Sequence, residues 1–470
     1  MNFKLPTKNP IPIKPGIYNI DLYQRIPFFQ VKDIKEQKKF FIVKSWEEAY
    51  ALHGDPKISD INPAYIATLI NKNYSAEISP YLRIRRLPRS SNFYLDNNGN
   101  IEIVKYNPFK YNKNKDEGFK AKEKIRSLLK RELKKILKNS NKKIFCEHSS
   151  GIDSNSILGT LINDLKINPE KINTLSFNDQ SEIDLIRSYR KFYNLKDENC
   201  YEIESKLKNK NITSNKKPFS KYELKILSIF GAPTMTGLSI DNCELLAENN
   251  CDLLFSGFGG DQCLSHNSSN IPTDLLVMKR WRDLYLWSDN FYEASKLFIK
   301  RTSIRKFSSL GRLNISIQKR KLARNNLLIN SLTQKGKELM SPFIREYFHP
   351  ELDLSLTSKE SIIQQISSEF VCIRREEETR LAKTYNISME FPLLSETIIN
   401  EVLKQDPLVF GNKSINDRQF AKDIFYPILP KELKTNASKQ RPLVSSNLLE
   451  LEKNIKINII EQFNDIDQTN

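Results

Sequence analysis

The sequence predicts an α/β protein, with a small α+β domain followed by a larger domain built on a doubly wound parallel sheet and ending in a helical part. Three observations indicate this. Short strand-like runs separated by turns occupy about the first 110 residues. Strand-like and amphipathic helical segments then alternate up to about residue 256, and a loop of small and acidic residues follows two of those strands. From residue 272 onward the pattern is mainly helical.

Length and composition are those of a globular protein with several domains. The chain has 470 residues, of which 39 % are hydrophobic and 28 % charged, and too few are Gly or Pro for a collagen-like or disordered chain. No run approaches the roughly 20 apolar residues of a membrane span, and the first residues lack the apolar core of a signal peptide. We therefore expect a cytoplasmic protein without membrane association.

Charge and metal-ligating residues limit the partners. A net charge of +18 favours polyanionic ligands such as ATP, RNA or an acidic peptide. Because the lysines are spread along the whole chain, a nucleic-acid partner is not favoured. The six cysteines form no CxxC pair, and the four histidines lie at no metal-ligand spacing from them, so neither a zinc site nor a disulfide framework is expected.

The small domain is expected in residues 1–112. Strand-like runs lie at residues 39–43, 93–95 and 101–104, and a turn at residues 96–100 separates the last two. The polar residues 110–117 are typical of a linker, and the larger domain is expected in residues 117–450. Residues 451–470 are predicted to be a polar tail.

The elements of the larger domain follow from the hydrophobic period. Apolar residues recur at helical spacing over residues 121–137. The alternation that follows predicts strands at 144–148, 172–177 and 252–256, and helices at 154–165, 182–193 and 235–248. Ligands of parallel sheets bind at the carboxyl ends of the strands, so the loops that follow the first and the last of these strands are the candidate site.

The first loop, SSGIDS at residues 149–154, is suited to hold phosphate. Small residues let the backbone fold around an anion at Gly151, while backbone N–H groups and the hydroxyls of Ser149, Ser150 and Ser154 supply donors. Asp153 would repel phosphate unless a cation bridged them, so it indicates Mg²⁺ on ATP or pyrophosphate. The alternative is that Asp153 and Ser154 only cap the helix.

The second loop, SGFGGD, follows the last predicted strand at the same edge of the sheet. It consists of Ser256, Gly257, Phe258, Gly259, Gly260 and Asp261. A glycine-rich turn is often merely a turn. Two such loops, each at a strand end and each with an aspartate, instead favour one site in which Asp153 and Asp261 flank the same metal ion.

Both loops resemble motifs of the asparagine synthetase superfamily, SGGxDS and SGxGxDE, in the same order. Residues 87–88, 93–95 and 105–108 are similar to the end of that family's N-terminal domain, and the resemblance covers roughly residues 85–442. Residues 391–394 resemble its PFLD stretch and residues 418–430 its KxxLR…LP stretch. Residues 174–177 resemble its second strand, which implies that the backbone of Ser176 and Phe177 receives adenine.

The resemblance implies a fold and a reaction. The fold is a degenerate N-terminal-nucleophile-like domain followed by a pyrophosphate-loop synthetase domain similar to the adenine nucleotide alpha hydrolases. In the reaction, a carboxylate attacks the α-phosphate of ATP, and an amine then displaces AMP from the acyl-adenylate to form an amide. The resemblance implies ATP and Mg²⁺ as cofactors. It also implies that the two loops bind the pyrophosphate part of ATP.

Two departures from the family bear on the substrate. Glutamine-dependent members begin with Met-Cys, whereas residue 2 is Asn2, so no glutaminase activity is expected. The β-lactam synthetases and lasso-peptide cyclases share this loss. Phe258 stands where the β-lactam synthetases have Tyr, which favours the peptide cyclases. We expect a peptide or small natural-product precursor as substrate, with a leader-peptide-binding protein as a partner.

Further departures concern the reacting centre. Ser150 replaces a Gly and must take a negative φ or carry strain. Ser388 replaces the family's catalytic Glu, and Glu390, two residues on, is the candidate for that role, with a plain surface glutamate as the alternative. Arg418 replaces the transition-state Lys, with Lys422 one helical turn on. Either cation could stabilise the anionic intermediate, unless both face water on a surface helix.

Three other functions stay open. An ammonia-dependent asparagine synthetase would use the same loops. A tRNA-modifying ATP pyrophosphatase has a similar first loop, but that loop usually lies near the N-terminus and no second SGxGGD loop accompanies it. An ATP-binding pseudoenzyme is the last alternative, because Ser150, Ser388 and Arg418 depart from the family pattern.

Overall fold

The computed structural model describes most of the two expected domains. The described residues are 12–23, 27–33, 40–54, 60, 62, 65, 79–97, 100–109, 119–138, 143–178, 182–204, 238, 240–266, 270–288, 292, 295–296, 334, 357–411 and 418–435. Asn2, the expected linker at residues 110–117 and the expected tail at residues 451–470 lie outside these residues.

The N-terminal part contains two antiparallel sheets of three strands each. Their orders are β1-β5-β6 and β3-β2-β4. The strands are β1 (Gly16–Ile20), β2 (Phe29–Lys32), β3 (Phe40–Val43), β4 (Ile84–Arg86), β5 (Ser91–Leu95) and β6 (Ile101–Lys105). Helix α1 (Trp46–His53) packs on the second sheet through Trp46, whose ring meets Phe29 edge to face. The three predicted strands are thus confirmed as β3, β5 and β6.

The larger domain is built on a parallel sheet, as the sequence predicts, and the sheet has five strands where three were predicted. Its order is β11-β10-β7-β8-β9. The strands are β7 (Ile144–Glu147), β8 (Ile172–Asn178), β9 (Cys200–Glu204), β10 (Leu253–Phe255) and β11 (Ser388–Glu390). The order reverses between β7 and β10, and such a switch point opens a crevice at the carboxyl ends of the two strands. Both predicted loops follow these two strands.

Helices cover both faces of this sheet. The described helices after α1 are α3 (Phe119–Leu137), α4 (Ile152–Gly159), α5 (Ile183–Phe192), α7 (Ile240–Glu248), α8 (Ile271–Val277), α9 (Trp281–Ser288), α14 (Ser358–Ile366), α15 (Glu369–Thr384), α16 (Glu396–Val402), α17 (Gln419–Phe425) and α18 (Lys431–Thr435). Successive residues of a strand point to opposite faces. Glu147 interacts with α15 and His148, the next residue, lies beside Tyr189 of α5, so α15 and α5 lie on opposite faces.

Two predicted helices differ from the observed ones. The helix expected over residues 154–165 begins two residues earlier, and at its end α4 gives way to a π-helical turn (Thr160–Asp164). The turn follows Gly159, where a Cβ would lie 2.8 Å from the carbonyl oxygen of Ile428. The helix expected over residues 235–248 is α7, which begins at Ile240, while residues 235–237 lie outside the described part.

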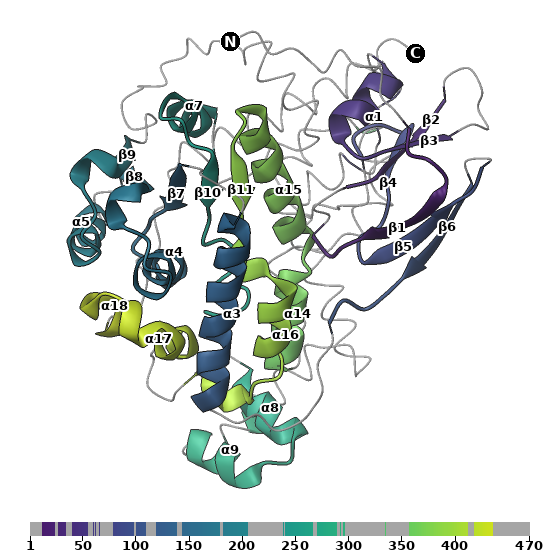
Figure 1. The fold of residues 1–470 in the computed structure, drawn as a ribbon. Coiled ribbons are helices and arrows are strands. Elements are labelled where there is room, and N and C mark those ends of the chain that lie inside the picture. Colours follow the sequence, from purple (N-terminus) through teal and green to yellow (C-terminus); the bar gives the residue numbers. More distant parts are fainter. Residues whose placement is uncertain are drawn as a thin grey trace.

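Helix α15 joins the two parts of the molecule (Figure 1). Arg86 of β4 pairs with Glu376, and Arg380 pairs with Glu47 of α1 at 3.1 Å. Arg89 donates to the carbonyl oxygen of Ser367 at 2.6 Å. The N-terminal sheets are therefore fixed to the helix that covers one face of the parallel sheet.

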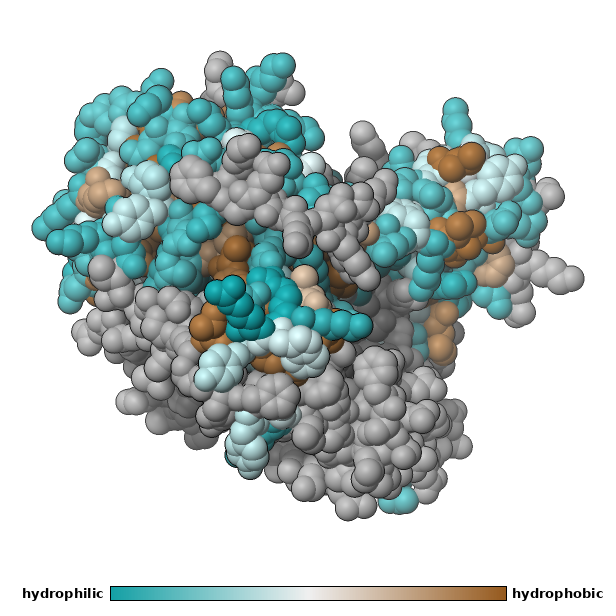
Figure 2. Space-filling model, turned by 90° about the horizontal axis from the view of Figure 1, so that it is seen from below, coloured by the Kyte–Doolittle hydropathy of each residue, from teal (hydrophilic) through white to brown (hydrophobic). Residues whose placement is uncertain are grey.

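On the face seen in Figure 2, the described surface is largely hydrophilic. Seen from below, polar side chains cover most of it and leave small apolar areas between them (Figure 2). Among the described helices, none has the length and apolar character needed to cross a membrane.

Candidate functional site

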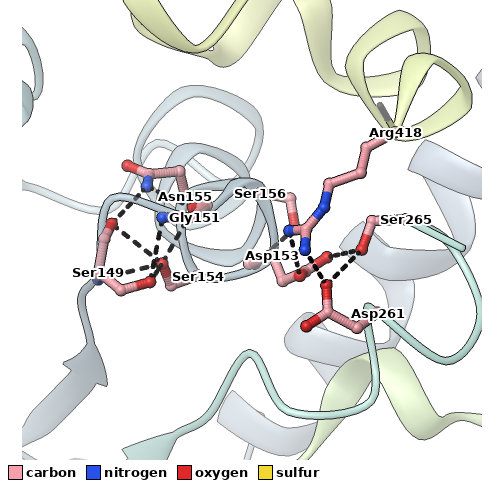
Figure 3. Close-up of polar contacts among 9 residues, drawn as sticks. All are labelled: Ser149, Gly151, Asp153, Ser154, Asn155, Ser156, Asp261, Ser265 and Arg418. Carbon is pink, nitrogen blue, oxygen red and sulfur yellow. Dashed lines mark hydrogen bonds and ion pairs between the residues drawn. The ribbon is translucent and has the colours of Figure 1, made fainter. Parts of the chain in front are cut away.

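The first loop (residues 149–154) is held in shape by its own side chains (Figure 3). The backbone N–H of Gly151 donates to the hydroxyl oxygen of Ser149 at 3.1 Å, and the hydroxyls of Ser149 and Ser154 lie 3.0 Å apart. Asn155, which the sequence analysis does not single out, donates to the carbonyl oxygens of Ser149 and Gly151 at 2.9 and 2.7 Å. These bonds fix the loop at the N-terminus of α4, where a helix attracts anions.

The capping alternative for this loop is wrong. The N-cap of α4 is Gly151, and no side chain caps it, because Asp153 and Ser154 lie inside the first turn of the helix. Of the two outcomes expected for Ser150, a negative φ or a strained backbone, the structure has the first, since Ser150 is not among the described non-glycine residues with positive φ. Ser therefore fits where the family has Gly.

The second loop (residues 256–261) touches the first, and this contact explains two of its glycines. A Cβ at Gly257 would lie 2.7 Å from the backbone nitrogen of Ser154. A Cβ at Gly260 would overlap the carboxylate of Asp153. Any side chain at either position would push the loops apart.

The two aspartates meet where the loops touch. The hydroxyl oxygen of Ser265 lies 2.8 Å from Asp153 Oδ1 and 3.3 Å from Asp261 Oδ1. Arg418 reaches the same point, with Nη2 at 2.6 Å from Asp261 Oδ1 and Nη1 at 3.7 Å from Asp153 Oδ2 (Figure 3). We call Asp153, Asp261, Ser265 and Arg418 the outer cluster. The sequence predicts that the two aspartates and Arg418 converge; it gives no signal for Ser265.

The donors of the outer cluster suit Mg²⁺. Two carboxylates within 3.3 Å of one hydroxyl oxygen are hard oxygen ligands close enough to share an ion. In nucleotide sites Mg²⁺ takes one or two carboxylates and completes its shell with phosphates and water. Metal binding by Asp153 and Asp261 stays a prediction.

Arg418 and Lys422 do not face water, so the surface-helix alternative is wrong. The side chain of Arg418 is 17 % exposed and Lys422 is 5 % exposed. Arg418 is the N-cap of α17 and has a left-handed backbone, with φ of 66°, and the backbone N–H of Lys422 donates to its carbonyl oxygen. A non-glycine residue in this conformation costs on the order of 1 kcal/mol and is often found at functional sites.

The residues expected at the adenine lie at the carboxyl end of β8. Ser176 is buried, and its hydroxyl oxygen accepts a hydrogen bond from Arg190 Nη2 at 3.1 Å. The backbone of Phe177 pairs with Ile203 of β9, while its side chain lies outside the described part. Contact with adenine stays a prediction for both.

Glu390 lies at the end of β11 and shares a face with Ser388, as the sequence predicts. The Ser388 hydroxyl donates to Glu390 Oε1 at 3.3 Å. The carbonyl oxygen of Glu390 accepts from the backbone N–H of Ser256, which ties β11 to the second loop. Glu390 is therefore next to the crevice, and its catalytic role stays a prediction.

A second group of polar side chains bridges β7 and β10, and of its four residues the sequence analysis singles out only Ser256. Ser256 donates to Glu147 Oε2, and Arg374 donates to Glu378 Oε1 at 2.9 Å. We call Glu147, Ser256, Arg374 and Glu378 the inner cluster. Burial, and after it the charge of Glu378, raises the pKa of Glu147 to about 7. The available signal was a glutamate inside an apolar strand, directly before the phosphate-type loop.

The comparisons with known proteins place this chain in no family. No family model matches it, and no curated protein matches it. Among solved structures it is similar to the U34-tRNA thiolase NcsA from Methanococcus maripaludis, solved with its [4Fe-4S] cluster, at 13 % identity over 56 % of this chain and 79 % of that one. The TM-score of 0.21 is too low to support an argument about fold or function.

Proposed function

We propose that the chain is an ATP-dependent ligase that forms an amide bond through an acyl-adenylate. One observation carries the proposal: Asp153 and Asp261, from two loops at the switch point, approach the same hydroxyl of Ser265. Paired carboxylates beside an anion-binding loop are the arrangement that a metal-bound pyrophosphate needs.

The roles of the residues follow from their positions. The hydroxyls of Ser149 and Ser150, together with the N–H groups of the first turn of α4 that follows Gly151, hold the β- and γ-phosphates. Asp153 and Asp261 would hold Mg²⁺, which would neutralise the charge that builds on the departing pyrophosphate. Gly257 and Gly260 let the second loop approach the first closely enough for this, while Ser256 and Gly259 are the other residues of the second loop assigned to the pyrophosphate.

Arg418 supplies a fixed positive charge beside the reacting phosphate. Its guanidinium already pairs with both carboxylates, and it can turn to the phosphates when they enter. Lys422, buried one turn further along α17, and Glu390, at the end of β11, complete the proposed catalytic set. Ser176 and Phe177 hold the adenine at the end of β8.

We further propose that the substrate is a peptide or a small natural-product precursor, and that the amine comes from the substrate and not from glutamine. The net charge of +18 suits a precursor with acidic side chains. A leader-peptide-binding protein is the proposed partner.

The test is the exchange of labelled pyrophosphate into ATP, with Mg²⁺ and a pool of free amino acids and short peptides that contain Asp or Glu. The parent should catalyse the exchange, and D153N and D261N should lower it by about a hundredfold or more. D184N, which changes an aspartate that is 91 % exposed on α5, is the matched control and should exchange like the parent.

Other outcomes identify the alternatives. Exchange supported by aspartate, with asparagine formed from ammonium, would indicate an asparagine synthetase. Binding of ATP without exchange in any pool would indicate a pseudoenzyme and overturn the proposal.

A further inference from the structure

The inner cluster spans the crevice between β7 and β10. Glu147 is the last residue of β7 and Ser256 is the first after β10, so their hydrogen bond crosses the switch point. Two residues after Glu147 the first loop begins, and the residue after Ser256 is Gly257, which contacts Ser154. The carboxyl of Glu147 is thus held against the first residue of the second loop, at the switch point between β7 and β10.

The side chain of Glu147 is partly exposed, whereas the neighbouring carboxyl of Glu378 is fully buried. The side chain of Glu378 has no exposed surface, and that of Arg374 is 25 % exposed. Arg374 is also shared with Phe258 of the second loop, because its guanidinium carbon lies 4.2 Å from the ring centroid. Arg374 pairs directly with Glu378 and also acts on the charge of Glu147.

The charged and titratable groups around Glu147 come from three elements. Glu378 and Arg374 of α15 act on it directly, and Ser256 donates to it from the end of β10. Cys243 of α7 lies near Glu378, and burial raises the pKa of that thiol to about 12, so it carries no charge at neutral pH. The pKa of Glu147, near 7, is suited to taking up and releasing a proton.

The residues that could otherwise accept a proton are missing from their expected places. Phe258 has no hydroxyl, and Ser388 has no carboxylate. Glu390 and Cys146 are both register partners of Phe255, so their side chains lie on the same face of the sheet. Glu147 follows Cys146 directly and therefore points to the opposite face from Glu390. Burial also raises the pKa of Asp274 and of Glu377, but among these described carboxyls Glu147 is the one bonded to a residue of the second loop.

We propose that Glu147 is the proton acceptor of the amide-forming step and that Glu378 is the positioning residue that adjusts its proton affinity. This inference rests on the proposed function. The neutral amine attacks the acyl carbon, so a C–N bond forms while the bond from that carbon to the AMP oxygen breaks. AMP leaves with the electron pair of that bond. The extra proton on the amine nitrogen passes to the carboxylate of Glu147, which becomes a neutral acid.

A first experiment follows the carboxyls of the ligand-free chain by carbon-13 NMR. One labelled glutamate carboxyl should titrate near neutral pH and should be lost in E147Q. E378Q should move this titration lower by roughly one pH unit, because a like charge is removed. E198Q, at a side chain that is 73 % exposed, is the control. A Glu147 carboxyl that titrates in the ordinary glutamate range would overturn the inference.

A second experiment separates the two half-reactions, with Mg²⁺, ATP, the same pool of carboxylates and either ethylamine or hydroxylamine. E147Q should keep pyrophosphate exchange and lose about a hundredfold or more in amide formation with ethylamine. Hydroxylamine, which is already unprotonated at neutral pH, should be less affected. E378Q should shift the acid limb of the pH–rate profile to lower pH, which a merely structural role would not do.

The outcomes distinguish the two proposals. Amide formation in E147Q at the parent's rate, with exchange intact, would overturn the acceptor role and leave the proposed function standing. If the parent itself shows no exchange, the proposed function fails, and the acceptor role fails with it.

Discussion

Two clusters of the same composition lie at one sheet edge. The outer cluster combines Asp153, Asp261, a serine hydroxyl and Arg418, and the inner cluster combines two glutamates, a serine hydroxyl and an arginine. In the outer cluster Arg418 pairs with both carboxylates, and one of them is 49 % exposed. In the inner cluster Arg374 pairs with Glu378 and the ring of Phe258, and Glu378 is fully buried.

The difference shows how packing assigns chemistry to identical groups. In the outer cluster the guanidinium bridges two partly exposed carboxylates, which are hard oxygen ligands of the kind a divalent metal ion prefers. Burial beside a second carboxyl favours the protonated form instead. The outer cluster is thus suited to hold phosphate and metal, and the inner cluster to hold a proton.

Removal of the Arg418 side chain from the outer cluster should have the largest effect on activity. R418A should lower the combined adenylation and amide-forming rate by about a hundredfold or more, while ATP binding stays near that of the parent. R418K keeps one charge but loses the forked contact with both aspartates, so a smaller loss is expected. Steady-state rates and equilibrium ATP binding measure the two effects, and parent-like turnover of both variants would remove Arg418 from the site.

Substitution of Gly260 should disturb the outer cluster by sterics alone. G260A places a Cβ against Asp153, so we expect at least a tenfold loss of pyrophosphate exchange and a loss of about 1–3 kcal/mol in the free energy of unfolding. G54A is the control, because Gly54 has φ of 75° but no atom lies within 4 Å of its Cβ position. That variant should lose stability without losing exchange.

The inner cluster should make stability depend on pH. The folded-state pKa of Glu147, about 7, lies above the ordinary glutamate value of 4.5, so the stability that this group contributes is complete below the unfolded pKa and is lost as pH rises through about 7. The free energy of unfolding should fall over this range by up to about 3 kcal/mol from this group. Burial raises the pKa of Glu377 too, and it adds to the slope.

Denaturant unfolding at several pH values measures this slope. E147Q should remove the part of the pH dependence of the unfolding free energy that comes from Glu147. The part that comes from Glu377 should remain. An unchanged slope in E147Q would mean that Glu147 is ionised in the folded chain throughout the range.

We expect no hydrolysis of glutamine by this chain. Because residue 2 is Asn2, the chain should release no glutamate from glutamine above background. A coupled glutamate assay measures this. Activity that disappears when one internal cysteine is replaced would overturn our interpretation of the N-terminal part.

The outer cluster could be predicted because its residues lie in short loops at strand ends. The alternation of strands and helices places both loops at one edge, so Asp153 and Asp261 had to come close. Arg418 lies far along the chain, and only the resemblance to a known motif pointed to it. Neither argument depends on side-chain packing.

The inner cluster could not be predicted because packing alone defines it. Glu378 lies in the acidic run 376–378, which in sequence is typical of a solvated helical face, yet all three side chains are buried. Strands β9 and β11 were missed for a related reason, since the latter has only three residues and becomes a strand by pairing with β10. Tertiary contacts decided each of these features.

The central claim is that Asp153 and Asp261 hold one metal ion on a bound nucleotide. The most direct measurement is a crystal structure of the chain with ATP and Mn²⁺ in place of Mg²⁺, located by its anomalous signal. We predict one peak at roughly 2.1 Å from an oxygen of each aspartate, with Arg418 turned toward the phosphates. A peak bound elsewhere, with Arg418 still paired to both carboxylates, would contradict the account.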